Sequence, residues 1–416
     1  MADSRSPIRR LLVTRGLRAF GDGYVSLLLP LFLLDLGFSP LEVGIVATAT
    51  LLGSGVLTLA VGRYAAPFAF RSLLIAATAL MAGTGIGFAA LTAFWPLLAI
   101  AVVGTLNPSN GDVSVFLPLE HALLARLAED ERRTAVFASY SLTGTLSAAV
   151  GALAAGLPAV AAPALGVSLR AAMQGMFVLY ALLAFAAALV YRGLPPTLSS
   201  GSRSTAAPLA ESKRRVYALA ALFSIDAFGG GFVVQSMVAL WLFQRFEMPL
   251  AAAGTLFFWT GVLSSISYLA AVRIAGRIGL VNTMVFTHLP ANACLVAIPF
   301  APDLAWAVAL LFVRSALSQM DVPTRSSYVM AIVTPAERPA AASITSVPRG
   351  LAAAASPALA GALLALSPFG WPLVAAGATK IVYDLLLLVT FRHLRPPEER
   401  AAPPAPAAGS CDNRRP

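Results

Sequence analysis

Phe20-Gly21-Asp22-Gly23 and Phe228-Gly229-Gly230-Gly231 are two versions of one short sequence, set about half a chain apart in a protein of 416 residues. Three further echoes follow at nearly the same offset: Arg63-Tyr64-Ala65 with Arg273-Ile274-Ala275, Asp112-Val113 with Asp321-Val322, and Glu131-Arg132 with Glu337-Arg338. The segments around these echoes are apolar enough to cross a membrane. Two copies of a hydrophobic unit that face each other enclose a cleft near the middle of the membrane, which is how secondary transporters are built. The repeat therefore predicts a transporter and leaves its solute open.

The composition places the chain in a lipid bilayer. Hydrophobic residues make up 58% and charged residues 12%, and the mean hydropathy is +0.80, whereas about a quarter of residues are charged in soluble domains. The net charge of +10 lies mostly in short connections between apolar runs, which favours orientation signals over a surface for nucleic acid. The two cysteines, Cys294 and Cys411, predict neither a disulfide framework nor a metal site, and no cofactor is expected.

The hydrophobic runs predict an all-α integral membrane fold with twelve transmembrane helices in two pseudo-symmetric six-helix bundles. At about 20 apolar residues per span, the first six spans are 11–35, 40–62, 71–92, 96–125, 134–157 and 170–191. The last six are 216–243, 249–272, 281–300, 304–333, 339–367 and 370–391. Residues 1–191 then form the N-terminal bundle, 192–215 a cytoplasmic linker, 216–395 the C-terminal bundle, and 396–416 a disordered cytoplasmic tail.

The distribution of basic residues predicts the orientation. If both termini are cytoplasmic, 21 of the 29 Lys and Arg residues lie in cytoplasmic segments, and only Arg170 and Arg245 lie in segments on the opposite side. This bias follows the positive-inside rule. We therefore expect a multi-pass protein of the cytoplasmic (inner or plasma) membrane, with a first span that is retained rather than cleaved as a signal peptide.

Ten ionisable residues lie well inside the predicted spans. The acids are Asp22, Asp112, Asp226, Asp321 and Asp384, and the bases are Arg18, Arg314, Arg325, Arg349 and Lys380. A charged side chain at the bilayer centre costs roughly 2.5 to 3.5 kcal/mol on insertion scales. We therefore expect these groups to face one another or a hydrated cavity.

Helical spacing indicates which of these groups can meet. Three pairs stand four residues apart and share a helix face: Arg18 with Asp22, Asp321 with Arg325, and Lys380 with Asp384. The last pair, on a peripheral span, is interpreted as a structural ion pair. Three further polar residues near cytoplasmic span ends are expected to reach the headgroups: Arg15, Glu120 and His121.

The fourth predicted span contains an unusual polar stretch, Asn107-Pro108-Ser109-Asn110-Gly111. This stretch predicts a kink or a partly unwound segment, which a membrane tolerates only where the freed backbone groups face protein or water. Asn107 and Asn110 are therefore secondary candidates for the site. Arg349 is a third, because it either binds carbonyls freed near the prolines of its span or reaches the cavity. His288 is interpreted as a satisfied polar residue rather than a proton relay.

Twelve spans in two repeated halves, joined by a cytoplasmic linker, resemble the major facilitator superfamily over nearly the whole chain. The fifth span carries Gly144 and then Gly151-Ala152-Leu153-Ala154-Ala155-Gly156, which is similar to the Gly-Pro-x-x-Gly-Gly motif of exporters in that family. The loop at 62–71 keeps Arg63 but has Ala66 where the family's loop motif has Asp. In this family spans one, four, seven and ten line the central cavity. The resemblance therefore implies a substrate or proton site built from Arg18, Asp22, Asp112, Asp226, Arg314, Asp321 and Arg325.

These observations predict a secondary active transporter that works by alternating access and uses protons as its coupling ion. The mixture of acids and bases favours a small polar solute, anionic or zwitterionic, and the fifth-span motif leans slightly toward efflux. Two alternatives stay open: a multidrug-type exporter of lipophilic compounds, favoured by runs such as Phe257-Phe258-Trp259, and a non-transporting sensor on the same scaffold. An enzyme is not expected, because the three histidines stand far apart and no HExxH, GxSxG or CxxC pattern occurs. The expected partners are the solute, protons and the lipid bilayer around a monomer.

Overall fold

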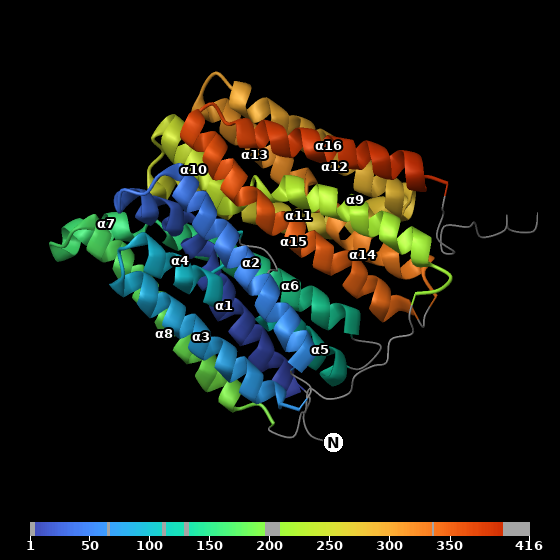
Figure 1. The fold of residues 1–416 in the computed structure, drawn as a ribbon, viewed down its shortest axis with the longest axis horizontal. Helices are drawn as coiled ribbons and strands as arrows, with labels where there is room; N and C mark the ends of the chain where they lie inside the picture. Colours follow the sequence, from blue (N-terminus) through green and yellow to red (C-terminus); the bar gives the residue numbers. More distant parts are fainter. Residues whose placement is uncertain are drawn as a thin grey trace, which may run out of the picture.

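The computed structural model describes residues 5–64, 67–109, 114–128, 133–195, 209–334 and 337–393, and they are mostly helical. The N-terminal bundle consists of α1 (Arg5–Asp35), α2 (Pro40–Tyr64), α3 (Phe70–Ala90), α4 (Phe94–Val103), α5 (Phe116–Leu127), α6 (Arg133–Ala154), α7 (Leu157–Leu165) and α8 (Leu169–Arg192). The C-terminal bundle consists of α9 (Lys213–Gly231), α10 (Gln235–Phe246), α11 (Leu250–Ile278), α12 (Leu280–Ala297), η2 (Ile298–Phe300), α13 (Leu304–Leu317), α14 (Asp321–Ile332), α15 (Arg338–Leu366) and α16 (Trp371–Phe391). Figure 1 shows the blue-to-green helices on one side and the yellow-to-red helices on the other.

The all-helical membrane fold predicted from the hydrophobic runs is confirmed. Among the described residues, 11 helices are long and apolar enough to cross a membrane. The predicted fourth span is divided into α4 and α5, and it differs from the others because Phe94–Val103 alone is too short to cross. The polar stretch that begins at Asn107 lies between these two helices, so the predicted interruption of this span is confirmed.

Two other spans are interrupted near the polar residues that they carry. The seventh span divides between α9 and α10, after the Gly229–Gly231 run, and the tenth divides between α13 and α14. The backbone N–H of Ser236, at the start of α10, donates to the carbonyl of Pro108 at 3.1 Å. This bond joins the break in the fourth span to the break in the seventh. Backbone groups freed by one break thus find partners at another, as a membrane interior requires.

The repeated glycine sequences mark equivalent helix crossings in the two bundles. A Cβ on Gly23 of α1 would lie 2.1 Å from the carbonyl oxygen of Ala148 on α6. At the equivalent position in the second copy, a Cβ on Gly231 would lie 2.2 Å from the carbonyl oxygen of Ala353 on α15. Real Cβ atoms do not approach carbonyl oxygens so closely, so only glycine allows these backbones to touch. The repeat found in the sequence is therefore a repeat of packing.

The two bundles meet mainly where α2 packs on α15 and where α6 packs on α11. Near the start of α2, a Cβ on Gly44 would lie 2.4 Å from the carbonyl oxygen of Pro357, and the backbone N–H of Ala358 donates to Thr48 Oγ1 at 2.9 Å. Near the start of α11, a Cβ on Gly254 would lie 2.6 Å from the carbonyl oxygen of Ala152. Because α1 carries the chain from the N-terminus to the start of α2, these contacts lie at the end of the bundles away from the N-terminus.

Glycines toward the opposite end of the same helices are not confined. A Cβ on Gly62 of α2, Gly276 of α11 or Gly350 of α15 would meet nothing within 4 Å. Among the glycines of these helices, the close contacts between the bundles therefore lie at one end.

Replacing Gly44 with Val should destabilise this conformation. The new side chain would collide with α15, and overpacking of this kind typically costs about 1 to 3 kcal/mol. Gly55→Val is the matched control, because it makes the same change on α2 where a Cβ would meet nothing within 4 Å. We expect the unfolding temperature of the purified protein in detergent to be clearly lower for Gly44→Val than for Gly55→Val. Equal unfolding temperatures would contradict the close crossing.

Candidate functional site

A polar cavity of about 260 Å³ lies between the two bundles. Its wall contains three charged side chains, which are Arg15 and Asp22 from α1 and Arg314 from α13. The polar uncharged residues of the wall are Ser109, Thr145, Gln235, Thr260, Ser264, Tyr268, Ser315, Ser318 and Gln319. The apolar part of the wall includes Val233, Val238, Phe257 and Leu311. Among the described residues, the cavity wall thus carries two cations, one carboxylate and many hydrogen-bonding groups.

Among the described residues, Asp22 is the one carboxylate on the cavity wall. Its side chain is nearly buried and accepts a hydrogen bond from the hydroxyl of Tyr180 at 3.2 Å. Among the described residues, no cationic nitrogen lies at ion-pairing distance from it, although Arg18 and Arg15 are within electrostatic range. The ion pair expected between Arg18 and Asp22 from their spacing is therefore absent, and Asp22 is left facing the cavity.

Arg15 lies at the cavity because Gly144 leaves room for it. A Cβ on Gly144 of α6 would lie 2.3 Å from Nε of Arg15 and 2.7 Å from its Cζ. The guanidinium also lies over the ring of Tyr140, with Cζ 5.1 Å from the ring centroid. The expectation that Arg15 extends to the headgroups is therefore wrong: its side chain is 9% exposed and borders the cavity.

Arg314 presents an uncompensated positive charge to the cavity. Its Nε is buried without a hydrogen-bond partner, and no ion pair forms between its guanidinium and any carboxylate in the part of the chain that the structure describes. The neighbouring lining residues on its own segment, Leu311, Ser315 and Gln319, carry no charge. A guanidinium presents up to five donors in a planar arrangement that suits carboxylate or phosphate. Arg314 is therefore the group on the wall best suited to bind an anion.

Arg18 forms an ion pair with Glu120 of α5, away from the cavity. Glu120 is fully buried and accepts hydrogen bonds from Tyr140, from Tyr191 at 2.5 Å and from Thr14 at 3.2 Å. The expectation that Glu120 reaches the headgroups is wrong, because three helices besides its own supply its partners. These contacts tie α1, α5, α6 and α8 together inside the N-terminal bundle.

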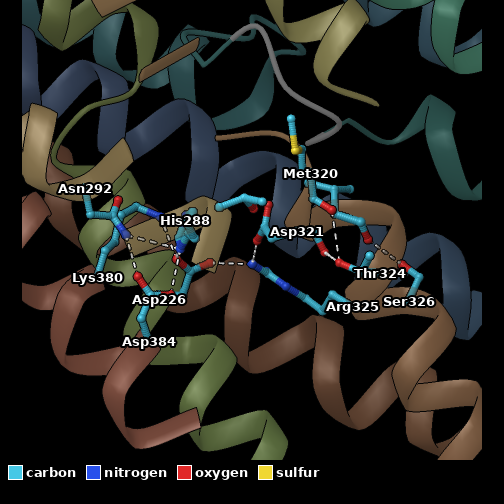
Figure 2. Close-up of polar contacts among 12 residues, drawn as sticks. Asp226, His288, Asn292, Met320, Asp321, Thr324, Arg325, Ser326, Lys380 and Asp384 are labelled. Atoms are coloured by element: carbon cyan, nitrogen blue, oxygen red, sulfur yellow. Dashed lines mark hydrogen bonds and ion pairs between the residues drawn. The ribbon is translucent and has the colours of Figure 1, made fainter. Parts of the chain in front are cut away.

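A larger charged cluster lies inside the C-terminal bundle (Figure 2). Asp226 of α9 accepts from Arg325 at 2.8 Å and from Lys380 at 2.6 Å. Arg325 also pairs with Asp321, one turn earlier on α14, as the four-residue spacing predicts. None of these four residues borders the cavity. Three of the residues named by the sequence, Asp226, Asp321 and Arg325, are thus brought together, but they do not line the cavity.

The other half of this cluster centres on Asp384. The ion pair expected between Lys380 and Asp384 is absent. Asp384 instead contacts His288 Nδ1 at 2.9 Å and accepts from Asn292 Nδ2 at 2.8 Å, while Lys380 reaches Asp226 on another helix. Figure 2 shows His288 and Asn292 on the side of the cluster away from Asp321. Sequence reasoning missed His288 and Asn292 as members of the cluster.

The remaining candidates occupy different positions. Asn107 is buried, and its Oδ1 accepts from the backbone N–H of Ser109 at 3.1 Å and from the Ser109 hydroxyl at 2.7 Å, which shapes the break after α4. Arg349 is exposed and within electrostatic range of Arg325, Asp226 and Asp321. Asp112 and Asn110 lie outside the described residues. Within the described ranges, no group of three His, Cys, Asp or Glu residues is placed to hold a metal ion.

Two helical bundles that cross a membrane and enclose a polar cavity between them define a membrane transport protein. The chain belongs to the major facilitator superfamily, whose family model matches residues 11–320. It is 24% identical over 420 residues to the uncharacterized membrane protein YJR124C of Saccharomyces cerevisiae, covering 92% of this chain and 94% of that protein.

Solved structures share the same fold. The nucleoside transporter NupG superposes with a TM-score of 0.72 at 14% identity, covering 92% of this chain and 99% of that chain. A bacterial homologue of the iron transporter ferroportin, solved in an inward-facing state, superposes with a TM-score of 0.69 at 15% identity, covering 94% and 99% of the two chains. At this identity the likeness concerns the fold alone.

Replacing Glu120 with Gln should strongly destabilise the protein, because Arg18 would be left as a buried cation without a counter-charge. Breaking a buried ion pair from one side costs about 3 to 5 kcal/mol, whereas replacing both partners with apolar residues is often close to neutral. We therefore expect Glu120→Gln to lower the unfolding temperature in detergent more than the double substitution Arg18→Met, Glu120→Met does. A double variant less stable than Glu120→Gln would show that the pair is not the main source of the effect.

Proposed function

We propose that this protein is a secondary active transporter of a small zwitterionic solute, driven by exchange with protons. The observation that supports this most directly is Arg314, a guanidinium on the cavity wall with no carboxylate partner among the described residues. Arg314 is half-buried and its Nε is withdrawn from solvent. A cation withdrawn from water without a partner is unfavourable, and an anionic group of the solute would supply the missing partner. An ion pair with Arg314 would therefore increase the affinity of the site for solutes that carry an acidic group.

The rest of the wall favours a solute that carries both charges. Asp22 offers a carboxylate that accepts a hydrogen bond from the neutral hydroxyl of Tyr180, so an ammonium group of the solute could bind it. A cavity of about 260 Å³ is slightly smaller than the usual 300 to 1,000 Å³ of drug-sized sites, which favours a small solute. The hydroxyls and amides around it can replace the water that a polar solute loses.

The packing of the bundles supports alternating access. Close contacts at glycines join the two bundles at one end. Toward the other end, a Cβ on Gly62, Gly276 or Gly350 would meet nothing within 4 Å. With both termini in the cytoplasm, as the basic residues indicate, that other end faces the cytoplasm and this conformation is inward-facing. We propose that residues 1–191 and 216–395 rock as two units around the cavity while the linker at 192–215 joins them. The transporter then works in the cytoplasmic membrane as a monomer.

Asp22 provides a means of coupling solute to protons. When the site is empty of solute, the carboxylate can bind a proton from the cytoplasm or the outside, depending on which end is open. An ammonium group of the solute would compete with that proton for the same oxygens. Because a proton and the solute compete for one site, transport exchanges one for the other across the membrane. Such exchange supports efflux, the direction that the fifth-span glycines also favour.

Arg314→Gln should remove binding of acidic solutes. A ligand that binds the folded state raises its melting temperature, so a thermal-shift screen of small amino acids, carboxylates and amines identifies the solute class. A hydrogen bond to a charged group contributes about 1.5 to 3 kcal/mol, so we expect roughly tenfold to hundredfold weaker binding. Arg277→Gln, which changes an exposed arginine at the end of α11, is the control and should bind normally.

The same screen tests the competing reading. The apolar lining residues Val233, Val238, Phe257 and Leu311 would suit a lipophilic compound. Stabilisation by lipophilic compounds, unchanged in Arg314→Gln, would replace the proposed solute class with a multidrug-type exporter.

Asp22→Asn should uncouple transport from protons. The amide keeps the shape of the carboxylate but cannot bind and release a proton. In everted membrane vesicles, we expect solute accumulation driven by a pH gradient in the wild type and its loss in Asp22→Asn, with exchange of labelled for unlabelled solute retained. Gradient dependence equal to that of the wild type would remove Asp22 from the coupling step.

A further inference from the structure

The charged cluster of the C-terminal bundle contains more carboxylates than cations. Its carboxylates are Asp226, Asp321 and Asp384, and its permanent cations are Arg325 and Lys380. All five side chains are less than 10% exposed as residues. An uncompensated ion in a protein interior is penalised by several kcal/mol. A buried cluster with three negative and two positive charges is therefore unfavourable.

The excess negative charge falls on Asp384. Arg325 is shared between Asp226 and Asp321, and Lys380 bonds to Asp226. Asp384 is fully buried, and its partners within the described residues are the imidazole of His288 and the amide of Asn292. Neither partner is a permanent cation. Protonated His288 would supply the missing charge.

The geometry of the imidazole suits the protonated form. Nδ1 of His288 lies 2.9 Å from Asp384 Oδ1, and Nε2 lies 4.0 Å from Asp226 Oδ1. Nδ1 is therefore at hydrogen-bonding distance from one carboxylate, with the amide nitrogen of Asn292 also 3.2 Å away, and Nε2 is at ion-pairing distance from a second carboxylate. Two carboxylates beside one ring favour the positively charged imidazolium, in which both nitrogens carry a proton. The ring itself is fixed edge-on to Tyr383, with centroids 6.1 Å apart.

Among the described residues, the helices packed around His288 bring no other cation into direct contact with this cluster. Helix α9 presents Asp226, α14 presents Asp321 and Arg325, and α16 presents Lys380, Asp384 and the hydroxyl of Tyr383. The basic residues of the other neighbouring helices point elsewhere: Arg314 of α13 borders the cavity, Arg273 and Arg277 of α11 are exposed, and Arg349 of α15 is exposed. Arg349 interacts at range with Asp226 and Asp321.

We propose that His288 and Asp384 form a proton-binding site, separate from the cavity, in which His288 is an imidazolium bridging Asp384 and Asp226 at neutral pH. The bound proton brings the buried cluster to three negative and three positive charges. This site goes beyond the proton exchange proposed at Asp22, because it lies in the other bundle and binds no solute.

The cluster is mechanically connected to the cavity wall. A Cβ on Gly229 would lie 3.0 Å from Cγ of Lys380, so the stem of this lysine packs directly on the glycine run that ends α9. Val233 and Gln235, which follow that run, line the cavity. Release of the proton from His288 would leave Asp226 and Asp384 competing for Lys380 and Arg325. Any shift of Lys380 would then change its packing on the glycine run that ends α9.

Nitrogen NMR of histidine-labelled protein in detergent tests the proposal without any solute. The chain has three histidines, His121, His288 and His393, and the His288 signals are assigned by their loss in His288→Gln. If that variant does not fold, they are assigned by exclusion from His121→Gln and His393→Gln. We expect both ring nitrogens of His288 to be protonated near neutral pH in the wild type.

Asp384→Asn provides the decisive comparison. It leaves two carboxylates against two cations, so the cluster no longer needs the proton, and His288 should become a neutral imidazole near neutral pH. Asp303→Asn, which changes an exposed aspartate of the same bundle, should leave His288 protonated. A neutral His288 in the wild type between about pH 5 and 8, where an ordinary histidine titrates, would overturn the proposal, as would an imidazolium that persists in Asp384→Asn. Either result leaves the proposed transport function untouched, because no solute takes part.

Discussion

A charge buried among membrane-spanning helices needs an opposite charge, a proton or water, and this constraint governs the polar interior of the protein. Arg18 satisfies it with Glu120, and Asp226 satisfies it with Arg325 and Lys380. Arg314 and Asp22 do not satisfy it within the described protein, and both border the cavity. The distribution of satisfied and unsatisfied charges therefore separates residues that hold a bundle together from residues available to a solute.

Much of the fold could be predicted because its causes are local or periodic. Span length, the repeated glycines and the break at Asn107 are visible as runs and spacings, and the structure places Gly23 and Gly231 at equivalent helix crossings. The buried charges were also visible, since any ionisable residue inside an apolar run is exceptional. What the sequence indicated was thus which residues are polar and buried, and in which helices.

The choice of partners could be predicted only for Asp321 with Arg325, because the other pairings depend on contacts between helices far apart in the chain. Residue spacing favours Arg18 with Asp22 and Lys380 with Asp384, yet Arg18 pairs across helices with Glu120, and Lys380 pairs with Asp226. A carboxylate on another helix can meet the end of an extended Arg or Lys side chain. A carboxylate one turn away on the same helix can be reached only if both side chains adopt particular rotamers. The same reasoning explains why Arg15 was missed: its place at the cavity depends on the missing side chain of Gly144, on a different helix.

The two bundles use the repeated framework in different ways. In the N-terminal copy, the glycine sequence carries Asp22, which faces the cavity. In the C-terminal copy, Gly230 stands at that position, and the acid of this span is Asp226, which lies one turn earlier and does not line the cavity. Moving the carboxylate by one turn exchanges a place on the cavity wall for contact with Lys380, whose stem packs on Gly229. One bundle thus presents its acid to the cavity, and the other holds its acid where it can act on the backbone that shapes the cavity.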